Sequence, residues 1–208
     1  MKINIFLILF LSLNVFAQGE KMSNTEAQAF RSEAENTAKS IQNLTTNFTQ
    51  YKHMTFLSEP IETSGQMVFE TPDKLLWKYT KPYSHSIIFK DHKVFINNEG
   101  NKSSIDVGNN KTFEQINQLI VGSVSGNLFN DESFSISYLK NSDYNIAVLN
   151  PKSNDIIKYI SRLELYFDKI TAAIVEVKLY EPSEDFTHIV FKNKETNVRL
   201  DQNTFTNK

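Results

Sequence analysis

Apolar and polar residues alternate with a period of two over most of the chain, a pattern that places one set of side chains on each face of a β-sheet. The clearest case is Gly65–Tyr79. Pro72 interrupts this stretch, has no N–H to donate and presets a turn, so we expect two antiparallel strands joined there. One face of the predicted hairpin is broad and apolar, and the other is charged. The apolar face consists of Met67, Phe69, Leu75, Trp77 and Tyr79.

The same alternation predicts strands on both sides of this hairpin, and Asp91-His92 is a tight hairpin loop between two of them. On the first strand of that pair, Ile87 and Phe89 face the same way. Short turns between consecutive strands imply antiparallel pairing. The predicted strands outside the first hairpin are Thr45–Leu57, Ser86–Lys90, Lys93–Asn97, Ser103–Val107, Ser133–Leu139, Tyr144–Leu149, Ile156–Phe167, Ala173–Tyr180 and Thr187–Lys192.

Two segments have apolar residues at helical spacing instead. Ser23 and Glu26 form a capping-box pattern, which predicts a helix over Ser23–Leu44. Its apolar stripe includes Phe30, Ile41 and Leu44 but is otherwise made of small residues. A shorter central helix is predicted after Thr112 and Gln115, with Ile116 and Leu119 on its apolar side.

These elements predict an α+β fold that is mostly β. About ten or eleven sequential strands would form a curved antiparallel sheet, an incomplete barrel. The N-terminal helix and the shorter central helix have apolar stripes that must cover something, so we expect them to close the mouth of this sheet. No linker or repeat divides the chain, which indicates a single domain.

The first residues are predicted to lie outside this fold. Lys2 precedes the apolar run Ile3–Phe16, which is shorter than the roughly 20 residues of a membrane-spanning helix. We interpret residues 1–17 as a secretory signal peptide that is cleaved near Ala17/Gln18, with residues 18–208 as the mature domain. A short membrane anchor is the alternative.

Composition narrows the function. The chain has no cysteine, so the fold must be stable through packing alone. A net charge of −2 argues against nucleic acid as a partner. The histidines are scattered, and there is no cysteine nucleophile, serine elbow or phosphate-binding glycine loop. We therefore expect no enzyme activity, no metal site and no cofactor.

The order of several short motifs resembles the LolA family, periplasmic carriers of outer-membrane lipoproteins. The motifs are Phe48-Thr49-Gln50 after an amphipathic helix, Gly65, Pro72-Asp73-Lys74-Leu75-Leu76-Trp77, Pro82 and Ile87-Ile88-Phe89. The chain departs from the family at Thr71, where better-known members carry an arginine that hydrogen-bonds to the lid. Threonine lacks the arginine's fork of donors, so the resemblance does not extend to the family's way of latching the lid, although it still implies the cavity.

The resemblance implies an apolar cavity under a helical lid, which would hold the acyl chains of a lipoprotein. The implied wall is Met67, Phe69, Leu75, Trp77, Tyr79, Ile87 and Phe89, and the implied lid is Phe30, Ile41, Leu44, Ile116 and Leu119. The implied partners are acylated lipoproteins, an inner-membrane lipoprotein-releasing ABC transporter and an outer-membrane acceptor. We expect a monomer located in the periplasm.

The residues by themselves leave alternatives open. Alternation does not distinguish a filled core from the wall of a pocket. On the same fold, the chain could be another periplasmic binder of lipids or hydrophobic ligands, or a sensor of lipoproteins. A secreted hydrolase is a third possibility, and it would require clustered polar residues in the cavity.

Overall fold

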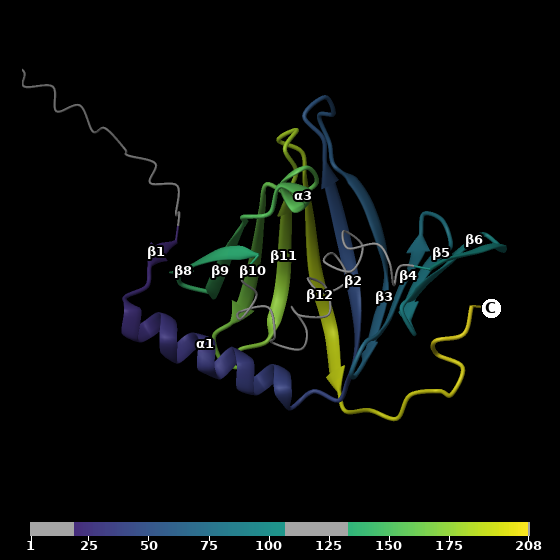
Figure 1. Ribbon diagram of the computed structural model, residues 1–208, viewed down its shortest axis with the longest axis horizontal. Coiled ribbons are helices and arrows are strands. Elements are labelled where there is room, and N and C mark those ends of the chain that lie inside the picture. Colours follow the sequence, from purple (N-terminus) through teal and green to yellow (C-terminus); the bar gives the residue numbers. More distant parts are fainter. Residues whose placement is uncertain (1–18, 107–132, 208) are drawn as a thin grey trace, which may run out of the picture.

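The computed structural model describes residues 19–106 and 133–207 (Figure 1). The predicted signal peptide and the predicted central helix, with Ile116 and Leu119, lie outside the described residues. Within the described ranges, no helix is long and apolar enough to cross a membrane.

The described residues form two helices and twelve strands. The helices are α1 (Asn24–Lys39) and α3 (Asn154–Ile157). The strands are β1 (Glu20–Lys21), β2 (Asn43–His53), β3 (Ile61–Glu70), β4 (Lys74–Lys81), β5 (His85–Lys90), β6 (Lys93–Asn98), β7 (Asn101–Asp106), β8 (Phe134–Lys140), β9 (Tyr144–Pro151), β10 (Arg162–Asp168), β11 (Ile174–Tyr180) and β12 (Phe186–Thr196).

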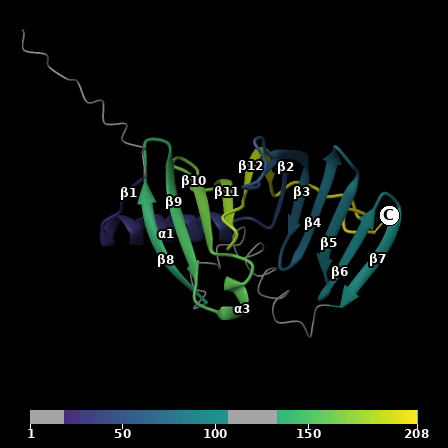
Figure 2. The same cartoon turned by 90° about the horizontal axis from the view of Figure 1, so that it is seen from above.

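All twelve described strands belong to one antiparallel sheet, in the order β1-β8-β9-β10-β11-β12-β2-β3-β4-β5-β6-β7. Two runs of sequential strands, β3–β7 and β8–β11, are joined where β12 pairs with β2. The sheet curves without closing into a barrel, as Figure 2 shows. This confirms the predicted curved, incomplete barrel. Helix α1 crosses one end of the β8–β11 half (Figures 1 and 2).

The start of α1 follows from its sequence. The Ser23 hydroxyl accepts a hydrogen bond from the Glu26 N–H (3.3 Å), and the Ser23 N–H donates to the Glu26 carboxylate (2.9 Å). Each contact satisfies an N–H that the first helical turn leaves free. The predicted capping box is therefore confirmed.

The predicted end of this helix at Leu44 was wrong. The helix ends at Lys39, and Leu44 lies in β2, where it pairs with Thr196 and Phe69. The Asn197 side chain accepts a hydrogen bond from the Gln42 N–H (2.7 Å), which fixes the extended chain after the helix. Pairing with strands far along the chain outweighs the local helical spacing.

The predicted strand Ile156–Phe167 was wrong in its first half. Ser153 begins the short helix α3 by accepting a hydrogen bond from the Asp155 N–H (3.3 Å), and only Arg162–Asp168 forms a strand. An unbroken strand would place Ile157 and Tyr159 on the same face as the buried Leu163, but they are 41% and 56% exposed, so the predicted alternation does not hold here.

The concave side of the sheet has two packed clusters rather than one continuous core. The first lies between α1, α3 and β8–β11, and the second lies over β2–β4. The buried residues of the first cluster are Met22, Phe30, Ala34, Phe134, Ala147, Leu149, Ile156, Ile160, Leu163, Leu165 and Phe167. Those of the second are Leu44, Phe48, Met67, Phe69 and Leu75.

Gly65 marks a close approach of two strands. The register of β3 and β4 shifts between Ser64 and Gly65, and a Cβ atom at Gly65 would lie 1.9 Å from the carbonyl oxygen of Lys78. Backbone cannot move aside as a flexible side chain can, so only glycine fits.

Gly65→Ala should therefore lower the free energy of unfolding by about 3 kcal/mol, the upper end of the usual cost of overpacking. Gly100→Ala is the control: it lies in open space with φ +92°, and should cost only about 1 kcal/mol for its left-handed backbone. Urea unfolding of both variants measures the difference. Equal losses would contradict the close approach at Gly65.

Candidate ligand cavity

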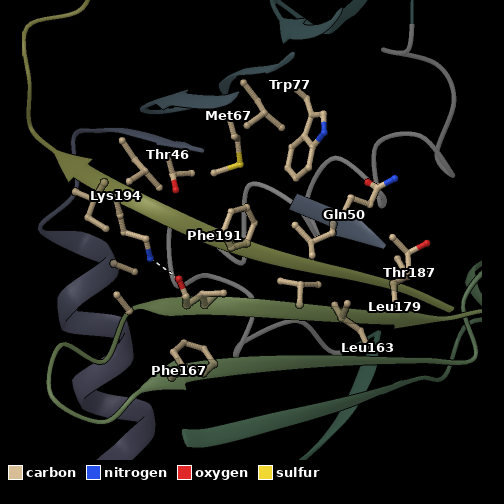
Figure 3. A pocket seen from close by; sticks show the side chains of 18 of the residues that line it. Thr46, Gln50, Met67, Trp77, Leu163, Phe167, Leu179, Thr187, Phe191 and Lys194 are labelled. Atoms are coloured by element: carbon tan, nitrogen blue, oxygen red, sulfur yellow. Dashed lines mark hydrogen bonds between the residues drawn. The ribbon is translucent and has the colours of Figure 1, made fainter. Parts of the chain in front are cut away.

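A cavity of about 350 Å³ lies between the two packed clusters, on the concave side of the sheet (Figure 3). Its size falls in the range of small-molecule pockets, and its wall is almost entirely apolar. The lining residues are Ala34, Thr37, Ala38, Ile41, Leu44, Thr46, Gln50, Met67, Leu75, Trp77, Tyr79, Ile87, Phe89, Ile160, Leu163, Phe167, Ala172, Ala173, Ile174, Val177, Leu179, Thr187, Ile189, Phe191 and Lys194.

Most of the predicted wall residues line this cavity. From β3, β4 and β5 they are Met67, Leu75, Trp77, Tyr79, Ile87 and Phe89. Phe69 is not among the lining residues; its side chain is fully buried in the second cluster. The contact of these residues with a ligand remains a prediction.

The predicted lid residues have different positions. Ile41 and Leu44 line the cavity, but from the connection after α1 and from β2 rather than from a helix. Phe30 lies in the first cluster, where its ring packs edge-on against the rings of Phe167 and Tyr138. The ring centroids are 5.0 Å and 5.9 Å apart, respectively. Phe30 is therefore a core residue under α1.

Helix α1 contributes only small side chains to the cavity: Ala34, Thr37 and Ala38. Ala34 and Ala38 are buried, so this face of the helix points inward. Larger side chains at these positions would project into the space that is now open. The small residues on the helical stripe are thus one reason why the cavity exists.

Sequence reasoning did not assign the half of the wall that comes from β10, β11 and β12. Leu163, Val177, Leu179, Ile189 and Phe191 line the cavity from these strands. Their alternation was visible in the sequence and predicted the strands. The alternation did not indicate that these residues face β3–β5 across one cavity. The two halves of the sheet face each other only because β12 pairs with β2, and the alternation does not predict that pairing.

Few polar groups interrupt the apolar wall where the structure describes it. The Tyr79 hydroxyl donates a hydrogen bond to the Gln50 side chain (3.1 Å), and the Thr46 hydroxyl donates to the carbonyl of Lys192 (2.9 Å). Burial raises the pKa of Tyr79, which keeps this phenol neutral. These bonded neutral groups add polarity to the wall without adding charge.

Lys194 is the exception, and sequence reasoning missed it. Its side chain lines the cavity from β12 near α1, and its ammonium donates a hydrogen bond to the carbonyl of Ile174 (Figure 3). Loss of hydration on burial lowers the pKa of Lys194 to about 8, against a smaller opposing attraction to Asp168. At neutral pH this cavity therefore contains a mostly protonated ammonium.

The turn at Thr71, where the family's arginine was expected, is exposed. Its N–H donates to the carbonyl of Gln42 (2.9 Å), and the neighbouring Glu70 pairs with Lys74 (3.2 Å). These contacts fix the turn against the chain that leaves α1. Among the described residues, no group of three or more His, Asp or Glu side chains could hold a metal ion.

The lowered pKa of Lys194 predicts a dependence of stability on pH. Between about pH 8 and the ordinary lysine pKa of 10.5, the unfolded chain keeps a proton that the folded chain has released. Stability that Lys194 costs below pH 8 should therefore be regained as the pH rises through this range.

Lys194→Met removes this titration, so the variant should be more stable than the wild type at pH 7 and lose that advantage by about pH 10.5. Thermal unfolding of both proteins at several pH values measures the difference. An advantage that does not change with pH would show that the ammonium is not desolvated.

Comparison with known proteins gives a family and a fold. The family model described as outer membrane lipoprotein carrier protein LolA matches residues 39–208. No curated protein matches the sequence significantly.

Solved structures support the fold at low sequence identity. An uncharacterized conserved protein from Thermus thermophilus aligns with a TM-score of 0.53 and 7% identity, over 86% of this chain and 92% of that chain. MucB aligns with a TM-score of 0.52 and 8% identity, over 88% of this chain and 63% of that chain. A LolA superfamily protein from Nitrosomonas europaea aligns with a TM-score of 0.45 and 9% identity, over 86% of this chain and 97% of that chain, which is too distant to support an argument.

Proposed function

This chain belongs to the LolA family, and from that premise we propose that it carries the acyl chains of lipoproteins from the inner to the outer membrane. On this proposal, an inner-membrane lipoprotein-releasing ABC transporter supplies the cargo and an outer-membrane acceptor receives it. The LolA family consists of periplasmic, non-enzymatic carriers. We propose the same location for this chain, after removal of residues 1–17, with residues 18–208 acting as a monomeric carrier domain.

The observation that carries the proposal is the apolar cavity between the two clusters. Its wall combines flat aromatic rings with a flexible thioether: the ring of Phe191 packs edge-on against that of Trp77, with 6.2 Å between the ring centroids, and Met67 lines the same cavity. Methionine adapts its shape readily to a ligand. Such a wall suits an acyl chain, which has no polar group to be recognised along its length.

The energetics of acyl transfer favour a cavity of this kind. Burying a methylene group gains about 0.8 kcal/mol relative to water, so an acyl chain exposed to water would be strongly disfavoured. The donor and the acceptor also shield the chain, and the carrier therefore needs only a dry space of similar quality. A cavity without specific polar recognition meets this requirement and can release its cargo.

A different binder of hydrophobic ligands on the same fold is the alternative. The likeness to MucB shows the fold alone, and this chain spans 63% of the length of that protein. The two functions predict different ligands in protein that is purified from the periplasm. Native mass spectrometry of the purified protein would show co-purified lipoprotein for the carrier and a free ligand for the alternative.

Filling the cavity tests the proposal directly. Ala38→Phe places a ring where α1 faces the cavity, and should weaken binding of a neutral acyl ligand such as methyl palmitate about tenfold through overpacking. Trp77 is the only tryptophan of the chain and lines the cavity, so its fluorescence reports ligand entry.

The control is Ala29→Phe, the same change on the exposed side of the same helix. This variant should bind methyl palmitate as the wild type does. Unchanged binding by Ala38→Phe, in a protein with a normal thermal unfolding transition, would contradict the assignment of the cavity as the acyl site.

A further inference from the structure

A β-bulge aims Lys194 into the cavity. The register of β12 with β2 shifts between Lys192, which pairs with Asn47, and Glu195, which pairs with Thr45, so Asn193 and Lys194 together oppose Thr46. Asn193 has φ 53°, the left-handed conformation in which asparagine is tolerated. Without the extra residue, strict alternation from Lys192 would send Lys194 to the outer face.

The bulge is held in place by the residue that it opposes. Thr46 is 1% exposed, and its hydroxyl donates to the carbonyl of Lys192 (2.9 Å), the last residue before the shift. The irregularity is thus part of the buried structure, not a loose end of the strand. Bulges of this kind commonly redirect a side chain at a functional site.

The ammonium of Lys194 has little compensation for its charge. Of its three donors, one is directed at the carbonyl of Ile174. Asp168 is the acid that acts on it electrostatically, and the Asp168 carboxylate already accepts hydrogen bonds from the N–H groups of Ile170 (3.1 Å) and Thr171 (2.8 Å). Since the described residues receive one hydrogen bond from this ammonium, the desolvated cation is a site for an anion.

The cavity continues from this cation as an apolar path. Phe191, Ile189 and Thr187 lie on the inner face of β12 beyond Lys194 and line the cavity. At roughly 3.3 Å per residue, the seven steps from Lys194 to Thr187 span about 23 Å, long enough for an extended palmitoyl chain. A charge at one end of an apolar path matches the shape of an amphiphile with an anionic head.

We propose that the cavity binds acyl lipids whose polar end is an anion, a carboxylate or a phosphate, and that Lys194 pairs with that anion. This inference rests on the proposed function, because it uses the same cavity. It adds a new ligand class. The acyl chains of a lipoprotein are attached through neutral ester and amide groups, whereas the ligands proposed here end in an anion.

The test compares three ligands that share one chain: palmitate, hexadecyl phosphate and methyl palmitate, titrated at pH 7 and at monomeric concentrations with Trp77 fluorescence as the readout. The wild type should bind at least one of the two anions about tenfold more tightly than the neutral ester, as expected for a charge-assisted hydrogen bond. Preference for palmitate alone identifies a carboxylate, and preference for hexadecyl phosphate alone identifies a phosphate.

Lys194→Met should abolish this preference, so that the variant binds palmitate and hexadecyl phosphate no more tightly than methyl palmitate. Lys192→Met is the matched control: it removes the same charge from an exposed position two residues earlier in β12, and should keep the preference. Circular dichroism and thermal unfolding verify that both variants are folded.

The outcomes separate this inference from the proposed function. Binding of methyl palmitate by the wild type, with no preference for an anion that depends on Lys194, would overturn the inference and leave the acyl cavity intact. Failure of the wild type to bind any of the three ligands would overturn both.

Discussion

The antiparallel pairing of β12 with β2 is the interaction on which the rest of the structure depends. It joins the run β3–β7 to the run β8–β11, each of which is otherwise linked by short local turns. Residues 146 positions apart meet here, as in the hydrogen bond from Thr46 to Lys192. The entropic cost of closing so long a loop grows only slowly with its length, and contacts between the two halves, such as the ring of Phe191 in β12 against that of Trp77 in β4, offset it. The pairing turns two meanders into one concave face.

The described side chains of that concave face pack into two clusters with a cavity between them. A sheet of more than about ten strands must curl, split or flatten, and this one curls without closing. Each half packs its own cluster, and the helix that crosses one end presents only Ala34, Thr37 and Ala38 toward the gap. Protein interiors are normally close-packed, so a persistent gap requires small residues at the positions from which it would be filled. The cavity is therefore a consequence of curvature together with the alanines of α1.

The sequence predicts local features of this structure and misses those set by distant contacts. The capping box of Ser23 and Glu26 and the hairpin loop at Asp91-His92, with φ values of 53° and 56°, were confirmed because neighbouring residues determine them. The end of α1 was missed because Leu44 pairs with β12 and β3. Alternation predicts which side chains share a face, but not whether that face is packed, so the cavity itself could not be read from the pattern.

Lys194 illustrates the same limit, because alternation alone assigns this side chain to the wrong face of the sheet. A period of two places lysine at this position on the solvent side, where it needs no explanation; one extra residue, Asn193, reverses that assignment. The reversal places an ammonium in an apolar cavity, which lowers the free energy of unfolding of the protein without ligand. A ligand that binds the folded state stabilises it, and an anion beside Lys194 would also relieve the cost of the desolvated charge. On the proposal made above, Lys194 lowers the stability of the protein without ligand and also selects for ligands with an anionic head. This coupling requires no conformational change.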